Sequence, residues 1–279
     1  MEKKRCFYSI PAFLMLAGAL GCSLYLHGQF LNKDSLLKRL TVSKEDTGKV
    51  LLLINLAKAF KNSNIAEAKR YCIDALALSN KLHYNRGRFL SLANEISLIR
   101  LEGADSLALE KCKSFVKQAE DARDEYNISA GYLNLGEVYD NIGDNEKAVE
   151  YSLKALAIAE RLNRKDLLQD AYGSLQRVYI SRTEFDKAVI YGKKAIDLAE
   201  EMKDMKRVVT QSYNLAFTYN VMKEFDQSFA LSKKIIAICK KISEPRIESY
   251  ALYNLCSISV RNEKNDDAPK YGMQCVELA

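Results

Sequence analysis

Apolar residues recur with helical spacing on both sides of a polar break in the stretch 132–162. Before the break they are Leu135, Val138, Tyr139 and Ile142, and after it Ala148, Tyr151, Ala155, Leu156 and Ile158. Gly143 and Asp144 interrupt the pattern. This spacing predicts two helices joined by a short turn. One such pair cannot bury all of its apolar surface, so we expect it to pack against further copies.

The same pattern returns about every 40 residues. Its clearest marker is a small residue in the second helix, found at Ala68, Ala108, Ala148, Ala188, Ser228 and Ala268. No long stretch alternates apolar and polar residues with period 2, so the predicted fold class is all-α. The pattern predicts six repeat units at 49–88, 89–128, 129–168, 169–208, 209–248 and 249–279, the last of them incomplete.

The third unit resembles the tetratricopeptide repeat (TPR) family. The matching residues are Tyr132, Leu135, Gly136 and Tyr139 in the first helix and Ala148 and Ala155 in the second, with Gly143–Asp144 at the turn. Ser152 replaces the family's second-helix aromatic residue, Glu160 replaces its proline, and the period exceeds the common one of about 34. The resemblance covers about residues 49–279. It implies a right-handed superhelical solenoid of antiparallel helix pairs that binds proteins or peptides.

Residues 1–28 have the layout of a secretory signal peptide. A short basic segment, Glu2–Arg5, precedes the apolar segment Phe7–Leu20. Cleavage is expected after Ala19 or after Gly28. Two alternatives remain open: lipoprotein processing at Cys22, and an uncleaved anchor, because the apolar stretch approaches the ~20 residues that span a bilayer.

The two ends of the repeat array differ. In the lead-in 29–48, Ser35–Leu40 predicts a short amphipathic helix, with Asp34 as N-cap, that covers the first unit. The last unit stops at Val276–Ala279 within its second helix, which suggests that the natural protein continues or that the final helix frays. The whole layout resembles the exported sensory halves of bacterial membrane-bound regulators. We therefore expect a periplasmic location, with membrane attachment through the N-terminus or through a downstream segment.

Charge gives no indication of a nucleic-acid partner. The formal net charge is +6, and the lysine pairs Lys193–Lys194 and Lys233–Lys234 fall at equivalent positions of consecutive units. Such pairs form a basic stripe or, as we expect here, the solvated outer face of the second helix.

Catalytic and metal-binding chemistry is also not indicated. The histidines are His27 in the leader and His83 between two units, and neither has a motif around it. The five cysteines beyond the leader lack ligand-like spacing and are expected to be buried free thiols: Cys72, Cys112, Cys239, Cys256 and Cys275. We expect no enzymatic activity, no cofactor and no metal.

A ladder of four asparagines and one serine is the strongest candidate for a binding site. It comprises the residue before the leucine position of successive first helices: Asn94, Asn134, Ser174, Asn214 and Asn254. In TPR proteins this position faces the concave groove, where asparagine bonds the backbone of an extended peptide. The alternative is that these amides are satisfied by local hydrogen bonds or water. Side chains within one helical turn of the ladder are expected to determine which ligand sequences bind: Arg177, Tyr213, Phe217 and Tyr253.

These patterns predict an exported TPR module that binds a protein or peptide as the input part of a signalling protein. The alternative is an envelope scaffold or lipoprotein that assembles other proteins without signalling. A membrane helix followed by a kinase or DNA-binding domain downstream in the full gene would favour the first.

Cleavage of the leader is testable by intact mass. Protein recovered from its native host should start after Ala19 or Gly28. A membrane-bound form that keeps Met1–Leu16 would contradict cleavage, and a diacylglyceryl group on Cys22 would establish the lipoprotein alternative.

Overall fold

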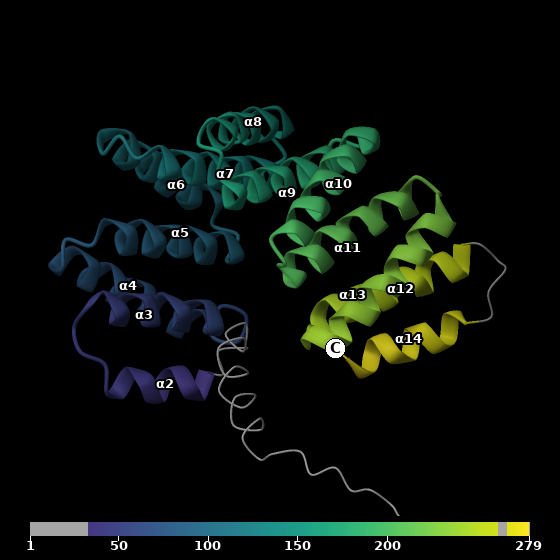
Figure 1. The fold of residues 1–279 in the computed structure, drawn as a ribbon, viewed down its shortest axis with the longest axis horizontal. Helices are drawn as coiled ribbons and strands as arrows, with labels where there is room; N and C mark the ends of the chain where they lie inside the picture. The colour runs from purple at the N-terminus through teal and green to yellow at the C-terminus, as the bar shows by residue number, and fades with distance from the viewer. Residues whose placement is uncertain (1–32, 262–266, 279) are drawn as a thin grey trace, which may run out of the picture. The chain divides into compact units, whose positions relative to one another are not determined.

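A computed structural model describes residues 33–261 and 267–278 (Figure 1). The described residues form helices and no strand, which confirms the predicted all-α class. The helices are α2 (Lys33–Thr41), α3 (Thr47–Phe60), α4 (Ile65–Lys81), α5 (Asn85–Leu101), α6 (Asp105–Asp121), α7 (Glu125–Asn141), α8 (Asn145–Arg161), α9 (Lys165–Ser181), α10 (Phe185–Glu201), α11 (Met205–Val221), α12 (Phe225–Ile242), α13 (Pro245–Arg261) and α14 (Ala268–Glu277). The predicted leader and its cleavage and lipidation sites lie outside the described residues. No helix in the described ranges is both long and apolar enough to span a bilayer.

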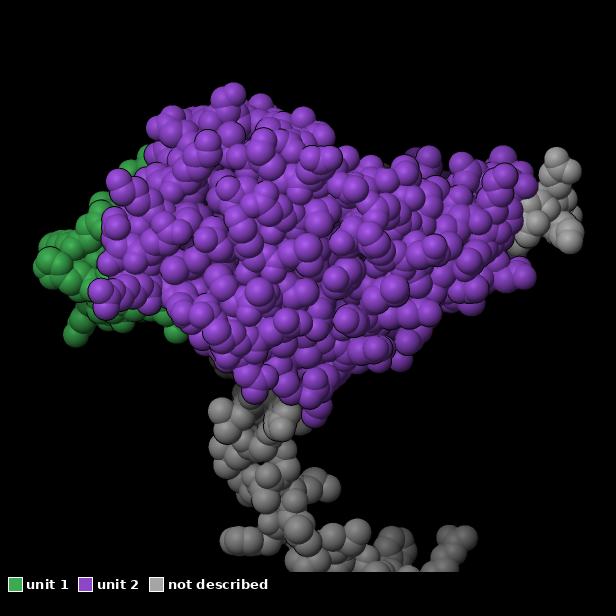
Figure 2. All heavy atoms as spheres, turned by 90° about the horizontal axis from the view of Figure 1, so that it is seen from above, with its two compact units in different colours: residues 1–87 green, residues 88–279 purple. Residues whose placement is uncertain are grey.

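The chain divides into two compact units, 1–87 and 88–279, coloured separately in Figure 2. In the first, α2 packs against α3, and Leu36 of α2 is fully buried. Asp34 is not the cap of α2, because the helix starts one residue earlier, at Lys33. Asp46 caps α3 instead, and its carboxylate accepts a hydrogen bond from the backbone N–H of Lys49 at 3.0 Å.

In the second unit, the helices form two rows. The first helices of successive repeats lie side by side, with α7 against α9, α9 against α11, and α11 against α13 (Figure 1). Each first helix also packs against its own second helix, as α7 does against α8 and α9 against α10. The stacked helix pairs predicted from the sequence are therefore confirmed, and the row α7, α9, α11 and α13 is called the inner row below.

The repeat length follows from the lengths of the helices and linkers. Two helices of 17 residues and two linkers of three residues make up each 40-residue repeat from 125 to 204. The helices that open the repeats start at 85, 125, 165, 205 and 245, four residues before the predicted unit boundaries. Their first turns carry polar and charged residues, so the apolar periodicity used to place the boundaries starts one turn late.

Each linker ends one helix and starts the next. At the first linker of the third repeat, the N–H of Gly143 donates to the carbonyl of Asp140 at 3.1 Å, and the N–H of Asp144 to that of Tyr139 at 2.9 Å. This is a Schellman C-cap, which needs one left-handed residue. Asp144 then caps the next helix by accepting a hydrogen bond from the N–H of Lys147 at 3.2 Å.

The left-handed residue recurs every 20 residues along the chain. It is found at His83, Gly103, Arg123, Gly143, Asn163, Thr183, Lys203, Lys223 and Ser243. Only two of these are glycines, and Thr183 is β-branched, the least favourable type at a positive φ.

The small-residue position marks the closest approach of the two helices in a repeat. Ala108, Ala148, Ala188 and Ser228 are completely buried. A Cβ added at Gly136 of α7 would lie 3.2 Å from the carbonyl oxygen of Ala148. The two helices therefore approach each other closely at this level, which explains why a small residue recurs there.

Exchanging two linker residues tests the left-handed position. Thr183→Gly should raise the free energy of unfolding by about 1 kcal/mol, because it relieves a β-branched residue at φ 61°. Gly143→Thr should lower it by about 1–2 kcal/mol, although no heavy atom lies within 4 Å of the added Cβ. Urea denaturation measures both. Equal stability of the two variants would contradict the linker geometry.

Candidate functional site

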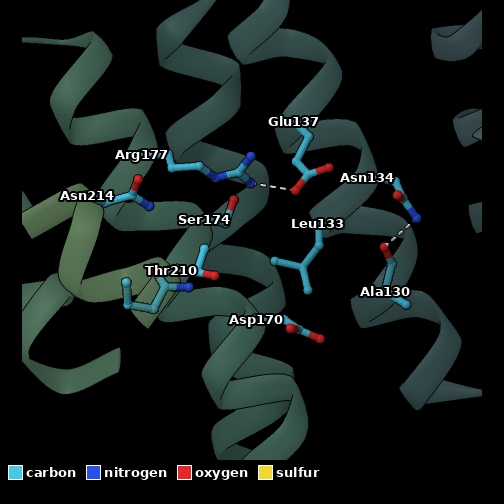
Figure 3. Close-up of a pocket in the computed structure, with 11 residues that line it drawn as sticks. Ala130, Leu133, Asn134, Glu137, Asp170, Ser174, Arg177, Thr210 and Asn214 are labelled. Carbon is cyan, nitrogen blue, oxygen red and sulfur yellow. Dashed lines mark hydrogen bonds and ion pairs between the residues drawn. The ribbon is translucent and has the colours of Figure 1, made fainter. Parts of the chain in front are cut away.

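A pocket of about 400 Å³ opens between the inner-row helices α7, α9 and α11 (Figure 3). It is lined by Ala130, Leu133, Asn134, Glu137, Asp170, Gly173, Ser174, Arg177, Thr210, Gln211 and Asn214. Most of these residues are spaced by three or four along their helices, so they share one face. Two positions recur on all three helices at intervals of 40 residues, one of them as Asn134, Ser174 and Asn214. The repeat thus assembles one surface from three consecutive units.

The structure brings four of the predicted site residues together here: Asn134, Ser174, Arg177 and Asn214. Nδ2 of Asn134 donates to the carbonyl of Ala130 at 3.0 Å, which leaves its amide oxygen available. The side-chain amide of Asn214 makes no hydrogen bond to the described residues, whereas its main-chain carbonyl accepts one from the hydroxyl of Thr218 at 2.8 Å.

Ser174 is already engaged. Its hydroxyl lies 2.9 Å from that of Ser152 on α8, and both residues are buried. Ser152 stands where the TPR family has an aromatic residue, and the smaller side chain makes room for this contact. Ser174 therefore lines the pocket with a hydroxyl that is already hydrogen-bonded within the protein.

Asn254 does not belong to the ladder, contrary to the sequence prediction. It is only 3% exposed. Its amide nitrogen lies 2.9 Å from the hydroxyls of both Ser228 and Ser232, and its oxygen accepts from Nδ2 of Asn220 at 2.6 Å. Both the nitrogen and the oxygen of this amide are thus hydrogen-bonded within the protein.

The remaining predicted residues lie outside the pocket. Asn94, on α5, donates to the carbonyl of Leu90 at 2.7 Å, a local bond of the kind the alternative interpretation expects. Tyr213 is half-buried against Tyr250, with 5.5 Å between the ring centroids. Phe217 and Tyr253 are exposed, on α11 and α13.

The sequence prediction missed an ionic cluster at the pocket wall. The carboxylate of Glu137 pairs with Arg177 of α9 and with Arg100 of α5, so it links three first helices. Burial alone pushes the pKa of the Glu137 carboxyl upward, but the two guanidiniums outweigh it and hold the pKa below its usual value. Glu137 is therefore ionised at neutral pH, and Arg177 is only partly free to meet a ligand.

Asp170 forms the opposite wall and pairs with Arg207. Burial raises the pKa of the Asp170 carboxyl, and the nearby carboxylate of Glu137 adds to the rise, whereas Arg207 opposes it. The pocket thus carries one compensated acid, one acid with a raised pKa and one partly available guanidinium.

Gln211 adds an unsatisfied amide to the site. Its Oε1 is buried and has no hydrogen-bond partner among the described residues. The amide occupies the space left by Gly173, where a Cβ would lie 2.6 Å from Nε2 of Gln211. A buried acceptor without a partner costs about 1–3 kcal/mol unless a ligand or water supplies a donor. For the ionic cluster, the available signal in the sequence was the pair of opposite charges at Glu137 and Arg177, which lie one 40-residue period apart.

Other reactive groups lie away from the pocket. Cys112 and Cys239 are buried free thiols, as predicted, and Cys72 is buried as well. Burial raises the pKa of Cys112 to about 12 and that of Cys239 to about 11. Cys256 and Cys275 are free and half-buried. Within the described ranges, no three histidine, cysteine or acidic side chains come together as a metal site would require.

Residues 127–201 match the family model described as Tetratricopeptide repeat. No curated protein gives a significant sequence match.

Solved structures share the fold at low sequence identity. BtubC (BKLC) from P. vanneervenii superposes with a TM-score of 0.64 at 19% identity, covering 78% of this chain and 90% of its own. A Pyrococcus horikoshii signal-transduction ATPase with a tetratricopeptide repeat sensor gives 0.60 at 18%, covering 87% of this chain and 38% of its own. A Rap protein complexed with competence and sporulation factor gives 0.56 at 18%, covering 87% and 69%. At these identities the likeness is one of fold.

Removing the central carboxylate tests the ionic cluster. Glu137→Gln should lower the free energy of unfolding at about pH 7 by roughly 1–2 kcal/mol, because Arg100 and Arg177 lose their shared partner. The lowered pKa means that wild type gains this stability above the ordinary glutamate pKa of about 4.3 and loses it as pH falls through the folded-state value.

The difference in unfolding free energy between wild type and Glu137→Gln should therefore shrink in acid. Urea denaturation at about pH 7 and at a pH below the folded-state pKa of Glu137 measures this difference. Glu150→Gln is the control, because Glu150 pairs with Lys154 on an exposed helical face and should matter little. A difference independent of pH would contradict the role of the Glu137 charge.

Proposed function

We propose that this chain, whose residues 127–201 match the tetratricopeptide repeat model, binds an extended segment of a partner protein in the pocket of α7, α9 and α11. The observation that carries the proposal is the unused hydrogen-bonding capacity of that pocket. The amide of Asn214 and the Oε1 of Gln211 lack partners among the described residues, and Asn134 keeps its oxygen. An amide offers a donor and an acceptor together, which matches a peptide backbone.

The spacing of the inner row suits an extended chain. Neighbouring packed helices lie about 8–10 Å apart, and an extended peptide advances about 3.3 Å per residue. About three ligand residues therefore separate one helix from the next, and a segment of about six residues reaches from Asn134 on α7 to Asn214 on α11.

The charged walls favour a particular ligand pattern. Arg177 lies between the two asparagines along the inner row, at the position where Glu137 stands one repeat earlier. A ligand carboxylate near Arg177 would compete with Glu137, while a ligand donor would meet Asp170. A segment with polar side chains in its middle fits this arrangement best.

The biological setting is also part of the proposal. The basic and apolar leader of residues 1–28 supports export, and we place the module in the periplasm or on the membrane facing it. A sensory role is supported by fold likeness to the P. horikoshii protein, whose repeats are described as a sensor, and to the Rap protein complexed with its factor. Binding of a segment to the inner row would be the input that the sensory module reports.

Replacing both pocket asparagines tests binding. Random 12-residue peptides displayed on phage would be selected on the wild-type protein and then titrated against Asn134→Ala with Asn214→Ala. Each lost hydrogen bond should cost about 0.5–1.5 kcal/mol, so binding should weaken about tenfold, with helical circular dichroism and melting unchanged.

The matched control is Asn141→Ala with Asn145→Ala, a pair outside this pocket. It should bind like wild type. Undiminished binding by the pocket double variant would remove these amides from the mechanism.

A further inference from the structure

The inner-row surface changes character between α9 and α11. The position that holds Glu137 on α7 and Arg177 on α9 holds Phe217 on α11, which is 42% exposed. The position of Asp170 on α9 becomes Tyr250 on α13, which is 43% exposed. The positions that line the polar pocket therefore carry aromatic rings further along the row.

Four rings make up this aromatic face: Tyr213, Phe217, Tyr250 and Tyr253. The rings of Tyr213 and Tyr250 pack at 5.5 Å and join α11 to α13. Tyr253 is 67% exposed and occupies the position at which Leu133 lines the pocket on α7. A cluster of exposed rings on a packed helical surface marks an interaction site, because the apolar area otherwise stays in contact with water.

The aromatic face is continuous with the pocket. Tyr213 and Phe217 lie on the same helix as Gln211 and Asn214, which line the pocket. Phe217 follows Asn214 by three residues, so both occupy one face of α11. A segment seated on Asn214 therefore meets these rings if it continues toward α13.

Two arginines flank the rings. Arg246 precedes Tyr250 by four residues, and Arg261 follows Tyr253 by eight, so the four share one stripe of α13. Arg246 has no ion-pair partner among the described residues, and Arg261 donates only to Oδ1 of Asn220, at 3.3 Å.

The acids nearby are already paired. Glu248, the single acidic residue of α13, is 8% exposed and lies 3.8 Å from Nζ of Lys240. Helix α11 carries no acid, and its two bases pair with acids outside the helix, Lys206 with Glu244 and Arg207 with Asp170 and Asp204. Helix α7, in contrast, carries acids and no base among its residues 125–141. Two of these acids are paired, Glu125 with Arg161 and Glu137 with Arg100 and Arg177, whereas Arg246 and Arg261 of α13 have no acidic partner among the described residues.

We propose that the aromatic face is a specificity subsite for the end of the bound segment, and that it takes aromatic or large aliphatic side chains next to aspartate or glutamate. This inference rests on the proposed function, since it extends the same inner-row site. The rings supply apolar area, and Arg246 and Arg261 supply the charges that carboxylates require. Because these rings and arginines gather on α13, the acidic, apolar end of the segment lies there.

Three fluorescein-labelled 12-residue peptides test the chemistry. All share one Ser- and Asn-rich half; the other half interleaves Phe with Glu, Phe with Lys, or Ala with Glu. Fluorescence polarisation with the purified protein should show the Phe–Glu peptide binding about tenfold more tightly than either of the others. Tyr250→Ala with Tyr253→Ala should remove the advantage of Phe over Ala, and Arg246→Glu should reduce or reverse the preference for Glu over Lys.

The variants separate this inference from the proposed function. If Asn134→Ala with Asn214→Ala weakens binding but the tyrosine variants and Arg246→Glu leave peptide preference unchanged, the subsite is wrong and the pocket stands. If none of the three peptides binds while the phage-selected peptides do, the subsite is wrong and the pocket stands. If the phage-selected peptides also ignore Asn134→Ala with Asn214→Ala, both are wrong. Tyr253 is exposed, so its replacement should leave circular dichroism and melting unchanged.

A second copy of the chain is the other occupant to exclude. Light scattering that shows a dimer of the wild type and a monomer of Tyr253→Ala would assign the aromatic face to self-association and overturn the proposal. A monomer in both cases, with the peptide preferences above, supports it.

Discussion

The three-residue linker, with one residue in the left-handed region, is the constraint on which the rest of the architecture depends. It ends a helix by a Schellman cap and places the next residue as a helix N-cap, as Gly143 and Asp144 do. The linkers keep one length, and the helices between them keep theirs at 17 residues over several repeats. Regular lengths bring each side chain back to the same place one repeat later, and this return brings Ala148 and Ala188 to the same helix contact.

The site follows from this regularity combined with local departures from it. Glu137 and Arg177 occupy one position of two successive repeats, so their opposite charges meet across neighbouring helices. Side-chain size also changes between equivalent positions of successive repeats. Gln176 takes the position of Gly136, and Gly192 takes that of Ser152. A Cβ at 192 would lie 2.4 Å from Nε2 of Gln176, so the larger residue on the first helix depends on the smaller one on the second. Fold and site therefore draw on the same positions, with different residues at each repeat.

The fold could be predicted from the periodicity of the sequence, because the same packing positions recur in every repeat. Helix pairs, the 40-residue period and the buried small residues could all be predicted from it. The ladder could be predicted only in part, since the position of a side chain does not say what it contacts. Asn254 has the same place in its repeat as Asn134, but hydroxyls at Ser228 and Ser232 draw its amide into the interior. The serine that interrupts the alanine series at 228 was the available signal of that buried network. Asp170 and Gln211 were missed because their roles depend on neighbouring helices.

The equal linkers also bear on how such a chain can change by recombination. A loss of residues 165–204 would remove α9 and α10 and join α8 to α11 through a linker of unchanged length. Helix α11 would then follow α7 in the inner row, and Phe217 would stand where Arg177 now meets Glu137. Duplication or loss of whole repeats thus preserves the helical framework while it replaces the groups presented on the inner row. Recombination of whole repeats can therefore change which ligand the inner row binds while the packing between helices stays the same.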